Sequence, residues 1–132
     1  MTQTLTVQSN QRDEFVDITA QVTQVVTDSA VDDGLCTVYI PHTTAAVTIQ
    51  ENADPDVARD IIVALQRLAP EREAGDYRHV EENAPAHVKV ALLGSSATVP
   101  VSRGRLLLGT WQAIFLVDFD GPRKRQVIVH VK

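Results

Sequence analysis

The run TWQAIFLVDF at residues 110–119 constrains the fold more than any other part of the sequence. A strand with one face in water alternates apolar and polar residues, but this run is apolar at nearly every position. Its β-branched and aromatic residues are typical of strands. We therefore expect a central strand from Thr110 to Phe119 that is covered on both faces.

Shorter strand-like runs precede this one, with polar or turn-forming residues between them. TLTVQ and EFVDI flank a polar turn near the start of the chain, and we expect them to pair as a hairpin. LCTVYI and AAVTIQE follow, and they are separated by a polar break at 41–44, where the backbone must turn or bulge. Side chains at that break are expected to point into a cleft.

The C-terminal part of the chain also consists mainly of strand-like runs. ATVPVS precedes a turn at 103–104, and the long apolar strand follows that turn. A second turn at 121–122 leads into QVIVHV, and the three runs together predict a β-meander.

Three segments carry the spacing or the end signals of helices. In the first, valines recur at helical intervals, and in the second an N-cap residue is followed by proline, which is favoured at the first helical position. The expected helices are 19–34 with Thr19 as the cap, 54–70 with Asp54 as the cap, and a short one from Pro85 to Gly94.

This order of elements predicts an α+β fold of one domain, residues 1–132. Strands lie at both ends of the chain, with two or three flanking helices between them. We expect an antiparallel β-sandwich, jelly-roll-like in outline.

Composition argues against several kinds of partner. The formal net charge is −5, and the basic residues form no run before 123–125, so we expect no nucleic-acid partner and no anionic membrane surface. The N-terminus lacks the pattern of a secretion signal, and no apolar run approaches the roughly 20 residues of a membrane span. We therefore expect a cytoplasmic protein.

The histidines are the strongest candidates for chemistry. His42, His79 and His87 lie in polar breaks, whereas His130 alternates with valines in a terminal strand and is expected to be structural or solvent-facing. Three imidazoles suit a zinc-like ion that keeps one position open for water or substrate. Their spacing matches no short metal motif, so ordinary hydrogen-bonded or surface histidines remain the alternative.

Small polar residues occur near these histidines. Glu51 is a candidate general base, although with Asn52 it also suits the approach to the helix at Asp54. The LLGSS segment offers backbone N–H groups and the hydroxyls of Ser95 and Ser96 to an anion, but it lacks the lysine of a phosphate-binding loop.

Three further features each have two interpretations. Cys36 reads as a small buried hydrophobe rather than a reactive thiol. Trp111 suits the core or a subunit interface. The basic run 123–125 is expected to be a solvated turn, with an arginine that reaches a phosphate as the alternative.

Three longer segments carry a family resemblance. They begin at Pro41 (PHTTAAVTIQENADPDV), Tyr77 (YRHVEENAPAHVKVALLGSSATVPV) and Gly104 (GRLLLGTWQAIFLVDFDGPRKRQVIV). From about Asp17 to the C-terminus the chain resembles the YjbQ family, also called UPF0047 or the secondary thiamine-phosphate synthase family. The order HTT, N-A-x-A-H, LLGSS and LGTWQ makes the resemblance specific.

The resemblance implies a β-sandwich that assembles as a homotrimer, with a histidine cluster in a cleft near the subunit boundary. A divalent metal ion, Zn or Mg, would be held there. The residues that the resemblance implies are His42, His79 and His87 for the metal, Glu51 and Gln112 for catalysis, and Thr43, Thr44, Asn83, Ser95 and Ser96 for substrate.

The implied activity is weak thiamine phosphate synthesis. A pyrimidine pyrophosphate alkylates the nitrogen of a thiazole phosphate, and pyrophosphate leaves, so the expected partner is a small phosphorylated molecule. The chain has Glu82 where family members often carry Gly or Asp, and Pro85 where they often carry Asp. These differences change the local charge beside Asn83. A non-catalytic binding module that holds a small ligand or a metal is the alternative.

Overall fold

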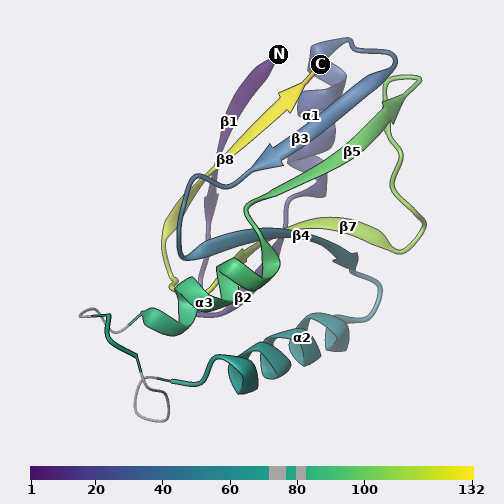
Figure 1. The fold of residues 1–132 in the computed structure, drawn as a ribbon. Coiled ribbons are helices and arrows are strands. Elements are labelled where there is room, and N and C mark those ends of the chain that lie inside the picture. Colours follow the sequence, from purple (N-terminus) through teal and green to yellow (C-terminus); the bar gives the residue numbers. More distant parts are fainter. Residues whose placement is uncertain (72–76, 80–82) are drawn as a thin grey trace.

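A computed structural model describes residues 1–71, 77–79 and 83–132 of the chain. Within these ranges, eight strands form two antiparallel sheets, and three helices flank them (Figure 1). The larger sheet has the order β1-β8-β3-β5-β6 and the smaller one β2-β7-β4, which confirms the expected α+β sandwich. The strands are β1 (Thr2–Gln8), β2 (Glu14–Asp17), β3 (Gly34–Tyr39), β4 (Ala45–Glu51), β5 (Ser96–Ser102), β6 (Arg105–Leu106), β7 (Gln112–Asp118) and β8 (Lys124–Val131), and the helices are α1 (Thr19–Ser29), α2 (Pro55–Leu68) and α3 (Ala84–Leu93).

β7 is the central strand of the smaller sheet, as its apolar sequence predicted, although it begins at Gln112 rather than Thr110. Ile114 and Leu116 point into the core between the two sheets. Phe115 and Val117 point into a second core, which α2 and α3 cover. The strand is thus apolar at successive positions because each of its faces meets a different hydrophobic core.

The core between the sheets is rich in valine. α1 adds Val22, Val25 and Val26, which are all buried against the inner face of the larger sheet. Cys36 is fully buried in the same core, and burial raises the pKa of its thiol to about 11. This confirms the interpretation of Cys36 as a buried hydrophobe.

The second core lies between the smaller sheet and the helices α2 and α3 (Figure 1). Both helices follow their sequence signals: the Asp54 side chain accepts a hydrogen bond from Asp56 N, and α3 ends at Gly94, where φ is +100°. α2 packs loosely, because Leu65 is its one buried residue and Leu68 is 70% exposed. No helix in the described part of the chain is long and apolar enough to cross a membrane.

Two expected strand pairings are wrong. β1 pairs with β8 and β2 pairs with β7, so the N-terminal runs do not form a hairpin. The linker 9–13 contains no glycine for a tight two-residue turn, and it carries the chain from one sheet to the other. The β-meander is also wrong beyond β5 and β6, because β7 lies in the smaller sheet and β8 returns to the larger one.

The ends of α1 also differ from the expectation. Ile18 occupies the N-cap position, and Thr19 is the first helical residue. The Thr19 hydroxyl donates to Asp17 Oδ1 and accepts from Ile114 N, so it ties the helix to β7 rather than capping it. The helix ends at Ser29, whereas Gly34 begins β3, where a Cβ atom would overlap the carbonyl oxygen of Lys132.

Candidate functional site

Two of the three predicted metal ligands, His79 and His87, lie against one another. Their ring centroids are 5.0 Å apart and the ring planes meet at 82°, edge to face. They line an open hollow of about 430 Å³ at the start of α3, which we call the histidine hollow. Tyr77, Arg78, Ala84 and Val88 complete its lining.

Separate contacts hold the two sides of the histidine hollow. On one side, the Tyr77 hydroxyl donates to the Pro70 carbonyl at 2.7 Å, which ties the segment before His79 to the end of α2. On the other side, the backbone N–H of His87 donates to the carbonyl of Asn83 at 3.4 Å in the first turn of α3. The relative position of the two rings therefore depends on how the end of α2 and the start of α3 are held.

Asn83 precedes α3 but does not cap it with its side chain. Its Nδ2 donates instead to Asp120 Oδ2 at 3.1 Å, in the turn after β7. Its Oδ1 is buried and has no hydrogen-bond partner in the described part of the chain. A buried acceptor without a donor is unusual in proteins and is destabilising.

His42 lies apart from this pair, in the break between β3 and β4. Its Nε2 accepts a hydrogen bond from Gln126 N at 2.9 Å, so the neutral ring carries its proton on Nδ1. Burial and the positive charge of Arg125 lower the pKa of His42, although Asp118 and the bond from Gln126 oppose them. In this chain the Nε2 lone pair of His42 is already in use.

The three predicted ligands do not meet within one chain. Across residues 1–71, 77–79 and 83–132, no group of three or more His, Cys, Asp or Glu side chains is arranged to hold a metal ion. The structure brings His79 and His87 together and leaves His42 elsewhere.

None of the predicted substrate residues is among the described residues that line the histidine hollow, although Asn83 directly precedes Ala84 of its wall. Ser95 and Ser96 stand where β5 begins, and Ile40 N donates to the Ser95 carbonyl at 2.8 Å. Thr43 is exposed in the β3–β4 break. The hydroxyl of Thr44 is buried and accepts from Arg125 Nη2 at 2.9 Å.

The two predicted catalytic residues lie beside each other. Glu51 and Gln112 are opposite one another in the β4–β7 ladder, and Gln112 Oε1 accepts from Gly109 N at 2.8 Å. Glu51 lines a different hollow, of about 280 Å³, together with Asp17 and Asn52. None of the residues described as lining that hollow is a histidine.

Asp17 is the best-bonded carboxylate of that second hollow. It accepts from the hydroxyl and the backbone N–H of Thr19 at 2.6 and 2.9 Å, and from Asn52 Nδ2 at 3.0 Å. Burial acts to raise the pKa of Asp17, but these hydrogen bonds outweigh it, and the pKa lies below its ordinary value. The bonds of Asp17 link β2 to α1 and to the segment before α2, which gives it a structural role.

Sequence reasoning missed a buried network that joins the two sheets. Arg125 was expected in a solvated turn, but it is 4% exposed and bonds to both carboxylate oxygens of Asp118 at 2.8 and 2.9 Å. Ser9 Oγ also donates to Asp118, at 2.6 Å. Arg125 lies two and four residues before the buried Val127 and Val129. This spacing was the available signal, because it places all three side chains on one face of β8.

The outer part of that basic run fits the expectation of a solvated turn. Arg123 is exposed and pairs with Asp120 at 3.0 Å, and Lys124 is exposed. Trp111, by contrast, is 63% exposed, so its placement in the core is wrong, and the subunit interface remains as its prediction. His130 is exposed, with Nδ1 2.6 Å from the Thr2 hydroxyl, as a solvent-facing strand residue should be.

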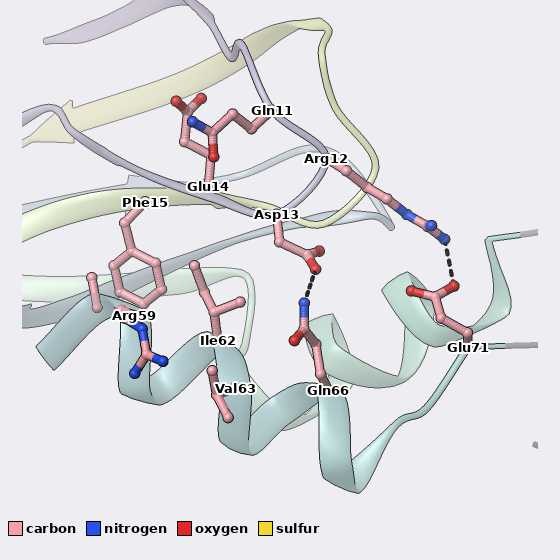
Figure 2. A pocket seen from close by; sticks show the side chains of 11 residues that line it. Gln11, Arg12, Asp13, Glu14, Phe15, Arg59, Ile62, Val63, Gln66 and Glu71 are labelled. Atoms are coloured by element: carbon pink, nitrogen blue, oxygen red, sulfur yellow. Dashed lines mark hydrogen bonds and ion pairs between the residues drawn. The ribbon is translucent and has the colours of Figure 1, made fainter. Parts of the chain in front are cut away.

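A larger cleft, of about 680 Å³, lies between α2 and the segment that includes β2 (Figure 2). Phe15 and Ile62 both form part of its wall. Arg12 pairs with Glu71 at 2.9 Å, and Gln66 Nε2 donates to Asp13 at 3.0 Å. No residue of the predicted site lines this cleft.

Comparison with known proteins gives a consistent result over the whole chain. The family model described as "UPF0047 protein YjbQ-like" matches residues 3–132. A UPF0047 protein of Methanocaldococcus jannaschii is 46% identical over 125 residues, which are 95% of this chain and 89% of that protein. UPF0047 protein YugU of Bacillus subtilis is 44% identical over 95% of this chain and 94% of its own.

Solved structures show the same fold. An uncharacterized YjbQ/UPF0047 protein from Clostridium acetobutylicum superposes with a TM-score of 0.94, at 48% identity and over 98% of each chain. A protein of unknown function from Sulfolobus solfataricus gives a TM-score of 0.93 at 34% identity, over 99% of this chain and 95% of its own.

Proposed function

Because this chain belongs to the YjbQ-like UPF0047 family, we propose that it is a metal-dependent enzyme of small phosphorylated molecules. Its reaction would resemble that of secondary thiamine-phosphate synthases, as a side activity or a main one. The observation that carries the proposal is the pair of imidazoles, His79 and His87, in one open hollow. A location in the cytoplasm is part of the same proposal.

The donor set fits two ligands of a metal site. Imidazole nitrogens bind zinc at about 2.0–2.1 Å, and the rings of His79 and His87 are close enough for small rotations to bring both onto one ion. Magnesium prefers oxygen ligands, so a histidine pair favours zinc over magnesium. The third ligand in this proposal is His42 of a neighbouring copy, since His42 of the same chain lies apart from the pair.

That third ligand must change its hydrogen bond. His42 Nε2 accepts from Gln126 N, and Nδ1 carries the proton of the neutral ring. Binding through Nε2 requires this bond to break, and binding through Nδ1 requires the proton to move to Nε2, which also ends the bond from Gln126 N. The lowered pKa of His42 keeps the ring neutral near pH 7, which is the form that binds metals.

The histidine hollow also contains a group suited to phosphate. Arg78 is exposed beside the two histidines, and a guanidinium binds phosphate oxygens through paired N–H donors. A bound divalent ion would supply neutralisation of the leaving pyrophosphate. In this proposal Arg78 orients a substrate phosphate, and Val88 and Tyr77 give an apolar wall to an aromatic ring.

A homotrimer is part of the proposal, because the predicted residues are divided between surfaces that one chain keeps apart. The outer face of the larger sheet exposes Leu35 (54%) and Tyr39 (47%), and Leu107 and Trp111 are exposed by 57% and 63%. In this proposal a neighbouring copy covers these side chains, as partners cover the exposed apolar patches of single chains. Glu51 and Gln112 act in catalysis, and Ser95 and Ser96 bind substrate, only if a neighbouring copy brings them to the histidine hollow.

Metal content and activity of single variants test the proposal. We expect purified protein to bind one zinc ion per chain, and His79→Ala, His87→Ala and His42→Ala each to lose it. His130→Ala is the matched control, because His130 is exposed on a terminal strand. Light scattering on the same samples gives the number of chains in the assembly.

Activity separates the enzyme from a binding module. We expect the wild type to release pyrophosphate from a pyrimidine pyrophosphate in the presence of a thiazole phosphate. His79→Ala and His87→Ala should lose this release. Full zinc binding without turnover would favour the non-catalytic module. Zinc retention in all three histidine variants would remove the metal site from the proposal.

A further inference from the structure

We propose that Asp120 is a positioning residue of the histidine hollow, which acts through the side-chain amide of Asn83 to fix the start of α3 and therefore the place of His87. This inference rests on the proposed function, because it gives that site a residue outside its lining. Asp120 lies in the turn between β7 and β8, 37 residues along the chain from Asn83.

The link from Asp120 to the ring of His87 is short. Asn83 Nδ2 donates to Asp120 Oδ2 at 3.1 Å, and the carbonyl of Asn83 accepts from Ala86 N and His87 N at 3.0 and 3.4 Å. Asn83 thus joins the turn to the first turn of the helix. A displacement of Asn83 moves the backbone that carries His87.

Asp120 is itself held to the rigid part of the fold. Its backbone N–H donates to Asp118 Oδ1 at 2.9 Å, and Asp118 is fully buried in its pair with Arg125. Arg123 also donates to the Asp120 carboxylate at 3.0 Å and to its carbonyl at 2.9 Å, but the Arg123 side chain is exposed, and an exposed pair of this kind contributes little to holding the turn. The anchor for α3 is therefore a turn that is fixed to the buried network between the two sheets.

The orientation of Asn83 is not explained by helix capping. An asparagine before a helix usually accepts a hydrogen bond from the first turn through Oδ1. Here the amide is turned to Asp120, and Oδ1 is buried without a partner in the described residues. This orientation of Asn83 is poor for stability, and it is explained if the bond to Asp120 serves the geometry of the hollow.

Zinc affinity and histidine NMR together test this role. In Asp120→Ala we expect zinc affinity to fall roughly 10- to 100-fold, as for other residues that orient metal ligands. In metal-free protein we expect the ring signals of His87 to shift, and those of His130 to stay in place. Asp120→Asn keeps a side-chain oxygen for Asn83, so it should restore most of the affinity.

Arg123→Ala is the matched control, because it removes the other partner of the Asp120 carboxylate and leaves the bond to Asn83. It should bind zinc as the wild type does. Equal losses in Asp120→Ala and Arg123→Ala, or unshifted His87 signals in Asp120→Ala, would overturn the proposal. If Asp120→Ala fails to fold, Asn83→Ala carries the test, with the same loss expected and retention of full affinity contradicting it.

Failure of the proposed function gives a different result. Wild-type protein that binds no zinc would remove the metal site, but the NMR comparison in metal-free protein would still decide whether Asp120 places His87. Zinc bound by the wild type and by Asp120→Ala with equal affinity would keep the metal site and reject the positioning role.

Discussion

The two hydrophobic cores differ in how they hold a buried cation. Between the sheets, Arg125 makes bonds of 2.8 and 2.9 Å to Asp118 and one of 2.9 Å to Thr44. Beneath the helices, Lys89 lies 3.4 Å from the carboxylate of Asp13. A planar guanidinium matches a carboxylate with two parallel bonds, whereas an ammonium group acts as a point charge.

This difference extends to the packing around each pair. The core between the sheets is closed by strands on two sides, and its large side chains are almost fully buried. The helices α2 and α3 form a layer over the smaller sheet, which we call the helical layer. In it, Leu65 is the one buried residue of α2, and open hollows lie on the flanks of that helix. The histidine hollow belongs to the helical layer, so the candidate site is built on the less constrained part of the fold.

The largest effect is expected from Arg125→Met. Removal of one partner leaves Asp118 charged and buried, and we expect the free energy of unfolding to fall by about 3–5 kcal/mol. Urea unfolding measures the loss. The double variant Arg125→Met with Asp118→Leu should recover part of it, and a loss smaller than that of Lys89→Met would contradict the comparison.

Truncation of a leucine in each core should give the next largest effect. Leu116→Ala, in the core between the sheets, is expected to lower the free energy of unfolding by about 2–5 kcal/mol, because strands on both sides cannot close the cavity. Leu65→Ala should lose less, since α2 can settle toward the smaller sheet. Equal losses in urea unfolding would show that the helical layer is as tightly packed as the sheets.

Lys89→Met is expected to lower the free energy of unfolding by about 1–3 kcal/mol, which is less than the loss in Leu116→Ala or Leu65→Ala. Methionine keeps the length of the side chain and its place near Phe119, where Lys89 Nζ lies 5.5 Å from the ring centre. Asp13 keeps its bond from Gln66. Lys124→Met, at an exposed position of β8, is the control and should leave thermal unfolding unchanged.

Titration of Asp118 is expected to have the smallest effect on stability near neutral pH and a measurable effect in acid. Burial acts to raise its pKa, but the hydrogen bonds from Arg125, Ser9 and Asp120 N outweigh burial and hold the pKa below its ordinary value of 3.8. A lowered pKa means that the folded state binds this proton less readily than the unfolded chain does. The stability from the carboxylate is therefore complete above pH 3.8 and is lost as the pH falls below it.

Urea unfolding at a series of acid pH values checks this prediction. The wild type should lose stability more steeply below pH 3.8 than Asp118→Asn, which has no carboxyl group to protonate. Parallel curves for the two proteins would show that Asp118 does not contribute to acid unfolding.

Local sequence signals predicted the elements whose ends depend on adjacent residues. Asp54 with Pro55 marked the start of α2, Gly94 marked the end of α3, and the apolar run of β7 predicted its central place. Pairing between strands did not follow from the sequence in the same way. Whether a linker such as 9–13 turns back or crosses to the other sheet depends on distant partners, here Asp118 for the buried Ser9.

The site shows the same division. The residue types in the polar breaks identified His79 and His87, which the structure brings together. The fixed place of His42 depends on a backbone N–H in β8, 84 residues away, which no local pattern encodes. The bond between Asp120 and Asn83 was not predicted either, because a turn aspartate has an ordinary local explanation and this bond exists only in the folded chain.

The position of β7 between two cores makes the alternation of its side chains intolerant of a shift by one residue. A single residue inserted within Gln112–Asp118 would swap the side chains sent to opposite sides, so that Phe115 and Leu116 would exchange surroundings. Both interiors would lose their fit at once. β1 has one exposed face, so a scan of single-residue insertions should find it far more tolerant than β7.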